Sequence, residues 1–180
     1  MTTEPLEVKL ARLTARLATL EAEAEIRRVM ARYMQLCDWP GQPLGNEFRE
    51  LFATDAVWEG IGPRYAGKYG RHEGRERIMA FFEGFTRAGQ VPCQFNAHFL
   101  TSEAIEVDGA AAIGRWMLLQ PSTSTRGEAN FVAARLHIGF RLEAGRWRIA
   151  HFRTENLFSR VEPVAWDSRA SEVAAVGASE

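Results

Sequence analysis

The 180-residue chain has little cysteine and almost no net charge, and each shortage excludes a class of protein. Its two cysteines, Cys37 and Cys93, stand alone without a CxxC pair, so we predict neither a structural zinc site nor a disulfide framework. Lys and Arg number 22 against 23 Asp and Glu. This balance removes the basic surface expected of a nucleic-acid-binding protein, and we expect no nucleic-acid partner.

Long apolar runs and nucleotide-binding motifs are also missing. No segment reaches the length of a membrane span, and the first ten residues lack the apolar region of a signal peptide. We therefore expect a cytoplasmic protein without a membrane partner. The sequence has no GxGxxG motif after a strand, no P-loop, no GxSxG motif and no closely spaced histidine pair. These absences predict a protein with no cofactor and no metal.

Aromatic residues, in contrast, are plentiful, with 11 Phe, 5 Trp and 3 Tyr. Such rings supply large apolar areas and can either fill a core or line a pocket for a flat organic ligand. Helical and strand periodicity assigns one group to the core: Phe48, Phe52, Phe81, Phe82, Phe140 and Trp147. A second group lies beside candidate polar residues or on strands that face a predicted cavity. We expect this group to form the wall of an apolar pocket: Trp39, Trp58, Tyr65, Phe95, Trp116 and Phe131.

The first half of the chain has mainly helical spacing. Leucines from Leu6 to Leu20 are spaced alternately four and three residues apart, which predicts a helix with a heptad seam that continues to a break at residues 38–41. The seam is shorter than three heptads, so it packs either on its own domain or on a neighbouring subunit. Further predictions are helices over 46–54 and 75–86, a short strand over 56–59, and a loop or irregular hairpin over the glycine-rich residues 60–74.

From about residue 94 the pattern becomes that of strands. We predict strands over 95–107, 111–119, 130–142 and 146–158, with turns at 108–109 and 144–145 and a polar loop over 121–128. Helices followed by antiparallel hairpins make an α+β domain. We expect an N-terminal helical arm over 1–24, one domain over 25–162 and a polar tail over 163–180.

Polar residues occur on both alternating faces of the last two predicted strands. Arg135 and His137 alternate with an apolar row, and Arg153 shares its parity with apolar residues of the last strand. We therefore expect the inner face of the sheet to line a partly polar cavity that includes Arg135, His137 and Arg153. The alternation leaves a second interpretation open for each of them, in which the side chain faces solvent.

A carboxylate, an imidazole and a phenol form the candidate catalytic group. Tyr33 and Asp38 lie near the end of the first long helix, and His98 lies in the first long predicted strand. A carboxylate that orients an imidazole fixes its tautomer, so that the histidine can remove a proton next to a carbonyl or a leaving group. A tyrosine hydroxyl can then polarise the carbonyl or protonate the departing group. The residues alone leave open that Asp38 caps the turn before Pro40 and that His98 is an ordinary strand histidine.

Five segments together carry a resemblance to a known family: EIRRVMARYMQLCDW, FRELFATDAVWEGIG, GRHEGRERIMAFFEGF, AHFLTSEAIEVDGAAAIGRWMLL and HIGFRLEAGRWRIAHFRTENLF. Over residues 20–160 the chain resembles the SnoaL-like branch of the nuclear transport factor 2-like superfamily, nearest to scytalone dehydratase, bile-acid dehydratases and a dehydrochlorinase. The resemblance implies a cone-shaped, strongly curved mixed or antiparallel sheet wrapped around N-terminal helices, a cystatin-like α+β barrel with a deep pocket. Asp38 and His98 fall on the Asp–His pair of that group, and Tyr33 falls on a tyrosine of the bile-acid dehydratases.

The same resemblance implies an activity. The chain is expected to be a cofactor-independent lyase acting on a cyclic hydrophobic small molecule, such as a polyketide, steroid or aromatic-pathway intermediate. Two alternatives stay open because the fold hosts them all: an isomerase or cyclase that uses the same dyad, and a non-catalytic lipophilic-ligand-binding or assembly domain. Arg153 is only near the register of an arginine in the dehydrochlorinase. Members of the family are usually oligomeric, so we expect a homo-oligomer, either a trimer or a dimer.

Overall fold

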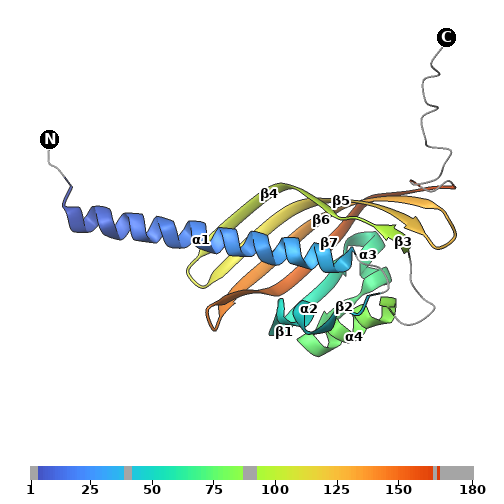
Figure 1. Cartoon of the computed structure of the whole chain (residues 1–180), viewed down its shortest axis with the longest axis horizontal. Helices are drawn as coiled ribbons and strands as arrows, with labels where there is room; N and C mark the ends of the chain where they lie inside the picture. Colours follow the sequence, from blue (N-terminus) through green and yellow to red (C-terminus); the bar gives the residue numbers. More distant parts are fainter. Residues whose placement is uncertain (1–3, 39–41, 87–92, 164–165, 167–180) are drawn as a thin grey trace, which may run out of the picture.

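The computed structural model describes residues 4–38, 42–86, 93–163 and 166, and it is an α+β fold (Figure 1). The helices are α1 (Leu6–Cys37), α2 (Gly45–Glu50), α3 (Gly62–Tyr69) and α4 (Arg75–Thr86). The strands are β1 (Phe52–Ile61), β2 (Arg71–Glu73), β3 (Cys93–Asn96), β4 (Phe99–Asp108), β5 (Ala111–Ser124), β6 (Ala129–Glu143) and β7 (Arg146–Glu162). The predicted helix over 75–86 and the predicted turn at 144–145 are confirmed, and the turn predicted at 108–109 lies one residue later, at 109–110.

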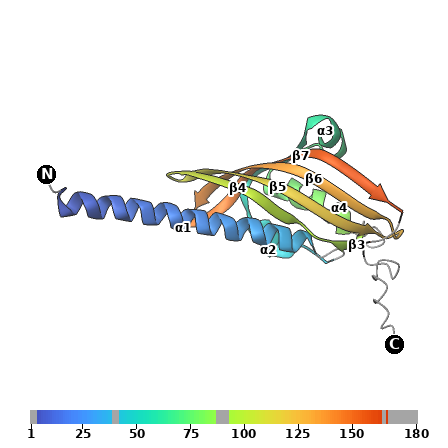
Figure 2. The same cartoon turned by 90° about the horizontal axis from the view of Figure 1, so that it is seen from above.

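One mixed sheet holds all the strands, in the order β2-β1-β7-β6-β5-β3, with β4 also paired to β5. The β1–β7 pair is parallel and the other pairs are antiparallel. Because β3 and β4 pair with successive parts of β5, they form one sheet edge that is interrupted at residues 97–98. Register shifts within the β4–β5 and β6–β7 pairs accompany the curvature of the sheet (Figures 1 and 2), as expected of bulges.

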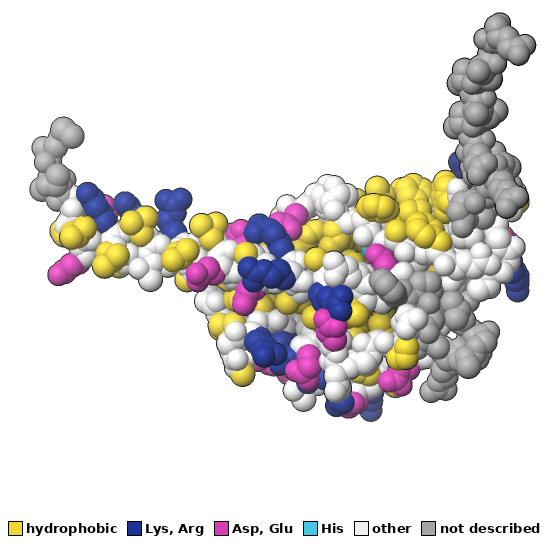
Figure 3. Space-filling view, in the orientation of Figure 1, with side chains coloured by type: hydrophobic (Ala, Val, Ile, Leu, Met, Phe, Trp, Pro, Cys, Tyr) yellow, Lys and Arg dark blue, Asp and Glu magenta, His cyan; other side chains and the backbone are white. Residues whose placement is uncertain are grey.

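The helix α1 has two parts with different surroundings. Its second half lies against the sheet and buries Ala22, Ile26, Met30, Tyr33 and Met34, which follow helical spacing. Its first half projects beyond the sheet, with hydrophobic side chains along its surface (Figure 3). The leucines from Leu6 to Leu20 are between 56% and 81% exposed, so the predicted alternative in which this seam packs on its own domain is wrong.

Aromatic residues form much of the core, as predicted, although two of them were assigned to the wrong place. Phe48 and Phe52 are fully buried, with ring centroids 5.3 Å apart, and Phe140 and Trp147 are also buried. Phe81 and Phe82, predicted as core, are only partly buried and line a cavity.

Two stretches before residue 75 differ from the prediction. The helix predicted over 46–54 ends at Glu50, and β1 begins at Phe52, so Phe52 is buried from a strand. Residues 60–74, predicted as a loop or irregular hairpin, form α3 and β2. This glycine-rich stretch contains a helix with Pro63 in its first turn. The helix places Tyr65 and Tyr69 one turn apart, with ring centroids separated by 4.7 Å.

The second half of the chain is closer to the prediction. The strands β6 and β7 match the predicted strands and extend beyond them by a few residues. The polar loop predicted over 121–128 is shorter, because β5 continues through Pro121 to Ser124. Most of the predicted 163–180 tail lies outside the described residues.

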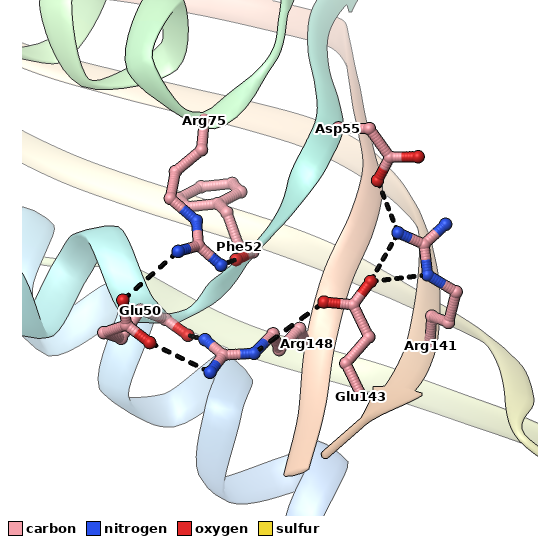
Figure 4. A network of polar contacts seen from close by, with 7 residues as sticks. All are labelled: Glu50, Phe52, Asp55, Arg75, Arg141, Glu143 and Arg148. Carbon is pink, nitrogen blue, oxygen red and sulfur yellow. Dashed lines mark hydrogen bonds and ion pairs between the residues drawn. The ribbon is translucent and has the colours of Figure 1, made fainter.

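A network of ion pairs joins α2 and β1 to the β6–β7 hairpin (Figure 4). Arg148 pairs with Glu50 at 2.9 Å, and Arg75 from α4 reaches the same carboxylate at 3.2 Å. Arg141 bridges Asp55 and Glu143. These ion pairs hold β1, which carries one wall of the cavity, in place against the β6–β7 hairpin.

Gly60 of β1 is packed so closely that a side chain does not fit. A Cβ there would lie 2.6 Å from the Tyr65 carbonyl oxygen, and the Gly60 N–H donates to the Gly70 carbonyl at 3.0 Å. We therefore expect Gly60→Ala to lower the free energy of unfolding by about 1–3 kcal/mol, measured by urea denaturation, because α3 must shift. Gly67 within α3 meets nothing within 4 Å. As the matched control, Gly67→Ala is expected to raise stability by up to about 1 kcal/mol, and equal losses in both variants would contradict the packing argument.

Candidate active site

A cavity of about 500 Å³ lies among α1, α3, α4 and the inner faces of β5, β6 and β7. Its walls are mainly apolar and aromatic, including Trp58, Phe82, Leu118, Leu136 and Phe152. A smaller set of polar side chains also lines it: Asn96, His98, Gln120, Ser122 and Asn130. An apolar enclosure of this size with a few polar groups is typical of a site for a small organic molecule.

His98 and Asp38 meet at the wall of this cavity. The Nδ1 atom of His98 lies 2.5 Å from Oδ1 of Asp38, although sixty residues separate them in the chain. Asp38 caps α1, where its N–H donates to the Met34 carbonyl at 2.9 Å. The sequence predicts His98 within the first long strand, and this is wrong. His98 lies in the break between β3 and β4. Because the carboxylate accepts a proton from Nδ1, the neutral ring carries its lone pair on Nε2.

Two groups that carry negative charge lie next to this imidazole. The side chains of His98 and Asp38 are 13% and 26% exposed, so solvent screens their interaction only in part. The C-terminal end of α1, with its partial negative charge, ends beside the pair. When Nε2 takes up a proton, the resulting imidazolium lies beside the Asp38 carboxylate and the C-terminus of α1.

Two amides hold the end of α1 in place next to His98. Asn96 donates from Nδ2 to the Cys37 carbonyl at 3.1 Å, and Gln120 donates from Nε2 to Oδ1 of Asn96 at 2.8 Å. The Ala97 N–H donates to the Pro121 carbonyl at 3.1 Å. These bonds attach both members of the dyad to β5, so their separation is set by the sheet.

Tyr33 lies one and a half turns before Asp38 on α1, buried but lining the same cavity. Its hydroxyl oxygen accepts a hydrogen bond from Trp58 Nε1 at 3.0 Å. Burial raises the pKa of Tyr33 well above 10, so the phenol keeps its proton across the pH range in which most enzymes work. Burial also raises the pKa of the adjacent Cys37 thiol to about 12, which makes this thiol a poor nucleophile.

The predicted aromatic wall is only partly present. Trp58 and Tyr65 line the cavity, whereas Trp39 lies outside the described residues. Trp116 is buried elsewhere in the core, 6.2 Å from the Phe140 ring centroid, with its Nε1 donating to Glu103 at 3.2 Å. The other two predicted rings, Phe95 of β3 and Phe131 of β6, do not line the cavity, so their assignment to its wall is wrong. Phe95 is 40% exposed, and Phe131 packs against Phe158 at 5.9 Å.

Arg135, His137 and Arg153 do not line the cavity, and this prediction is wrong. Their neighbours Leu136 and Thr154 do line it, and alternation along β6 and β7 therefore directs these three side chains to the opposite face. Arg135 pairs there with Glu155 at 2.9 Å, and His137 lies opposite Arg153 in the strand register. Partial burial, together with Arg153 and Arg115, lowers the pKa of His137.

Several cavity residues were missed at the sequence level. The sequence does not identify Asn96 and Gln120, because single amide side chains on strands form no recognisable spacing pattern. Tyr69 could have been found as the partner of Tyr65 four residues earlier, had α3 been recognised. Phe81 and Phe82 were found but assigned to the core.

The described part of the chain has neither a metal-binding cluster nor a membrane-spanning helix. Within 4–38, 42–86, 93–163 and 166, no three His, Cys, Asp or Glu side chains come together as a metal site. No helix in that part of the chain has both the length and the apolar character needed to cross a membrane.

Comparison with known proteins supports the fold and identifies a family. The SnoaL-like domain family matches residues 18–153. A type 2 hexachlorocyclohexane dehydrochlorinase superposes with a TM-score of 0.69 at 16% identity, covering 86% of this chain and 98% of the enzyme. A candidate scytalone dehydratase from Novosphingobium aromaticivorans gives 0.65 at 16% identity, with 83% and 97% covered.

A third similar structure describes the architecture directly. An NTF2-like protein with a cystatin-like fold, also from Novosphingobium aromaticivorans, gives a TM-score of 0.62 at 25% identity, covering 87% of this chain and 92% of that protein. The expected cystatin-like α+β fold is thereby confirmed. No curated protein sequence matches the chain.

Proposed function

The chain belongs to the SnoaL-like domain family, and from this premise we propose that it is a cofactor-independent lyase that eliminates a small leaving group from a cyclic hydrophobic molecule. The observation that carries the proposal is the 2.5 Å contact between His98 and Asp38 at the wall of an apolar cavity. Similar structures include a dehydrochlorinase and a candidate dehydratase, both of which are elimination enzymes by name.

His98 is the proposed general base. Its Nε2 removes a proton from a carbon next to the leaving group or a carbonyl, and Asp38 stabilises the imidazolium that forms. The electrons of the broken C–H bond form the new double bond, and the leaving group departs with its own electron pair. In a dehydration the imidazolium returns the proton to the departing hydroxide, so that water is released and the histidine becomes neutral again.

Tyr33 is proposed to act as a hydrogen-bond donor. Its pKa, raised by burial, makes the phenolate costly, which favours polarisation of a substrate oxygen over complete transfer of the phenolic proton. The Trp58 N–H donates to the Tyr33 oxygen, and the Cys37 thiol is a second hydrogen-bond partner of the hydroxyl. To donate to a substrate, the hydroxyl hydrogen turns from the thiol, a weak acceptor, to the substrate oxygen. A donor of this kind stabilises negative charge that develops on a carbonyl oxygen as the proton is removed.

The cavity limits the substrate class. A volume of about 500 Å³ with aromatic walls suits one or a few fused rings, such as a polyketide, steroid or aromatic-pathway intermediate. We further propose a cytoplasmic location, supported by two cysteines that are both unpaired. The expected homo-oligomer also remains a proposal.

The mass of the product tests this function. We expect the chain to convert a member of a panel of cyclic β-hydroxy ketones and halogenated rings into a product that has lost water or hydrogen halide, as measured by mass spectrometry. The matched His98→Ala protein is expected to be slower by about 10²–10⁴-fold, because the base is removed. A product of unchanged mass would instead identify an isomerase or cyclase, and tight binding without turnover would identify a carrier.

A further inference from the structure

The first half of α1 presents a leucine seam that no described part of the chain covers. Leu6, Leu10, Leu13, Leu17 and Leu20 are each more than half exposed. Figures 1 and 2 show this part of the helix extending away from the sheet in both views, and Figure 3 shows hydrophobic side chains interspersed with charged ones along it. Exposure of a regular row of leucines to water is energetically unfavourable, so we expect a partner to cover this seam.

The seam lies on the opposite side of α1 from the domain. Nine residues separate Leu13 from Ala22 and Leu17 from Ile26, which is two and a half turns at about 3.6 residues per turn. Ala22 and Ile26 are buried against the domain, so the leucines point away from it. Because α1 is one continuous helix, the seam cannot turn back onto its own sheet.

We infer that the seam pairs with the same seam of a second copy, forming a parallel two-stranded coiled coil. In heptad terms Leu6, Leu13 and Leu20 occupy d positions, and Leu10, Leu17 and Ala24 occupy a positions. The flanking e and g positions are mostly charged: Glu7, Lys9, Arg16, Glu21, Glu23 and Arg28. The apolar stripe is therefore narrow, which suits two strands better than three.

The charges favour the parallel orientation. Parallel helices bring a g residue close to the e residue five positions later on the partner, which places Arg16 against Glu21 and Glu23 against Arg28. In the antiparallel register that overlaps all six seam residues, Arg16 faces its own counterpart, and Glu7 faces Glu21. In that antiparallel register Lys9 faces Glu23, which is attractive, so attraction and repulsion are mixed. In the parallel pair both of the charged contacts are attractive, and this difference favours the parallel orientation.

Two-fold symmetry is compatible with the position of the domain. In a parallel pair the symmetry axis runs between the two seams, and each domain lies on the outer side of its own helix. The cavities remain on their separate domains, so this pairing does not depend on the proposed lyase activity.

The mass of the full-length chain in solution tests the pairing. Light scattering is expected to give about twice the 20.2 kDa chain mass, and the Leu13→Glu/Leu17→Glu variant is expected to halve it. The matched control, Val8→Glu/Ala15→Glu, adds the same charge to the face opposite the seam and is expected to keep the doubled mass. Thermal unfolding shows whether each variant remains folded. A monomeric parent, a trimeric parent, or equal dissociation of both variants would overturn the inference.

Cross-linking tests the orientation. In the parallel pair each Leu13 lies beside the Leu13 of the second copy, so Leu13→Cys alone is expected to give a disulfide-linked dimer under mild oxidation. The parent chain, with its two native cysteines, is the control. If cross-linking occurs only in mixtures of Leu13→Cys and Leu17→Cys chains, the helices are antiparallel and the inferred orientation is wrong.

Discussion

Replacing Asp38 with asparagine is expected to lower kcat about 10³–10⁴-fold while the chain stays folded. The carboxylate accepts the Nδ1 proton of His98 at 2.5 Å, which leaves Nε2 free to accept a proton from the substrate. An asparagine amide can instead donate to Nδ1, which moves the ring proton to Nε2 and blocks the base. It also removes the negative charge that stabilises the imidazolium, and the loss of both effects at a catalytic dyad has this magnitude.

The control for this variant is another carboxylate that is paired but lies away from the cavity. Asp55 binds Arg141 in the surface network of Figure 4, so Asp55→Asn removes the same charge without touching His98. Nitrogen-15 NMR of the imidazole adds a readout that needs no substrate, since the Asp38→Asn protein is expected to carry its proton on Nε2. A kcat within about threefold of the parent would remove Asp38 from the mechanism.

The contact between Asp38 and His98 could not be derived from spacing. The end of α1 could be predicted because Pro40 and Gly41 follow Asp38, but nothing local connects this helix end to a residue sixty positions later. The resemblance to a family placed both residues in one pair. The structure shows why the two residues are close. His98 lies at the break between β3 and β4, and Asn96 of β3 donates a hydrogen bond to the Cys37 carbonyl at the end of α1.

The sequence did not predict where the sheet curves or which of its faces lines the cavity. Alternation along β6 was predicted correctly, but it does not say which parity faces a cavity when both contain polar residues. Register shifts between Ala133 and Ala134 and between Gly139 and Phe140 lie on either side of Leu136, whose side chain lines the cavity. Side chains next to Leu136 on the strand point to the opposite face. Arg135 and His137 therefore lie on the far face, although their positions in the strand were predicted.

The same limitation explains why α3 was missed. Its only large apolar side chains are Tyr65 and Tyr69, and the glycines around them are typical of a loop. What stabilises this short helix is tertiary: Tyr65 is buried, its hydroxyl accepts a hydrogen bond from Asn156 of β7 at 3.3 Å, and Gly60 allows close approach to β1. One wall of the cavity therefore depends on tertiary contacts, which helix propensity alone does not predict.

Replacing Tyr33 with phenylalanine is expected to lower kcat about 100-fold and to change KM by less than about threefold. The phenol contributes a donor that matters most when charge develops on the substrate oxygen, so its loss raises the barrier more than it weakens binding. The apolar ring remains and keeps its stacked contact with Phe152 at 4.8 Å. Trp58 Nε1 loses its acceptor, which is expected to lower stability by about 1–3 kcal/mol, so activity is compared well below the unfolding temperature.

Tyr69 is the matched control, because it also lines the cavity and carries a phenol whose pKa is raised by burial. Tyr69→Phe removes an equal hydroxyl on α3, away from the end of α1, and is expected to leave kcat within about threefold of the parent. The pH profile separates a hydrogen-bond donor from a group that must ionise. Since the pKa of Tyr33 lies well above 10, parent activity is not expected to show a Tyr33-dependent limb below pH 10. A limb near pH 8 that disappears in Tyr33→Phe would mean that the phenolate takes part, and the donor role would have to be abandoned.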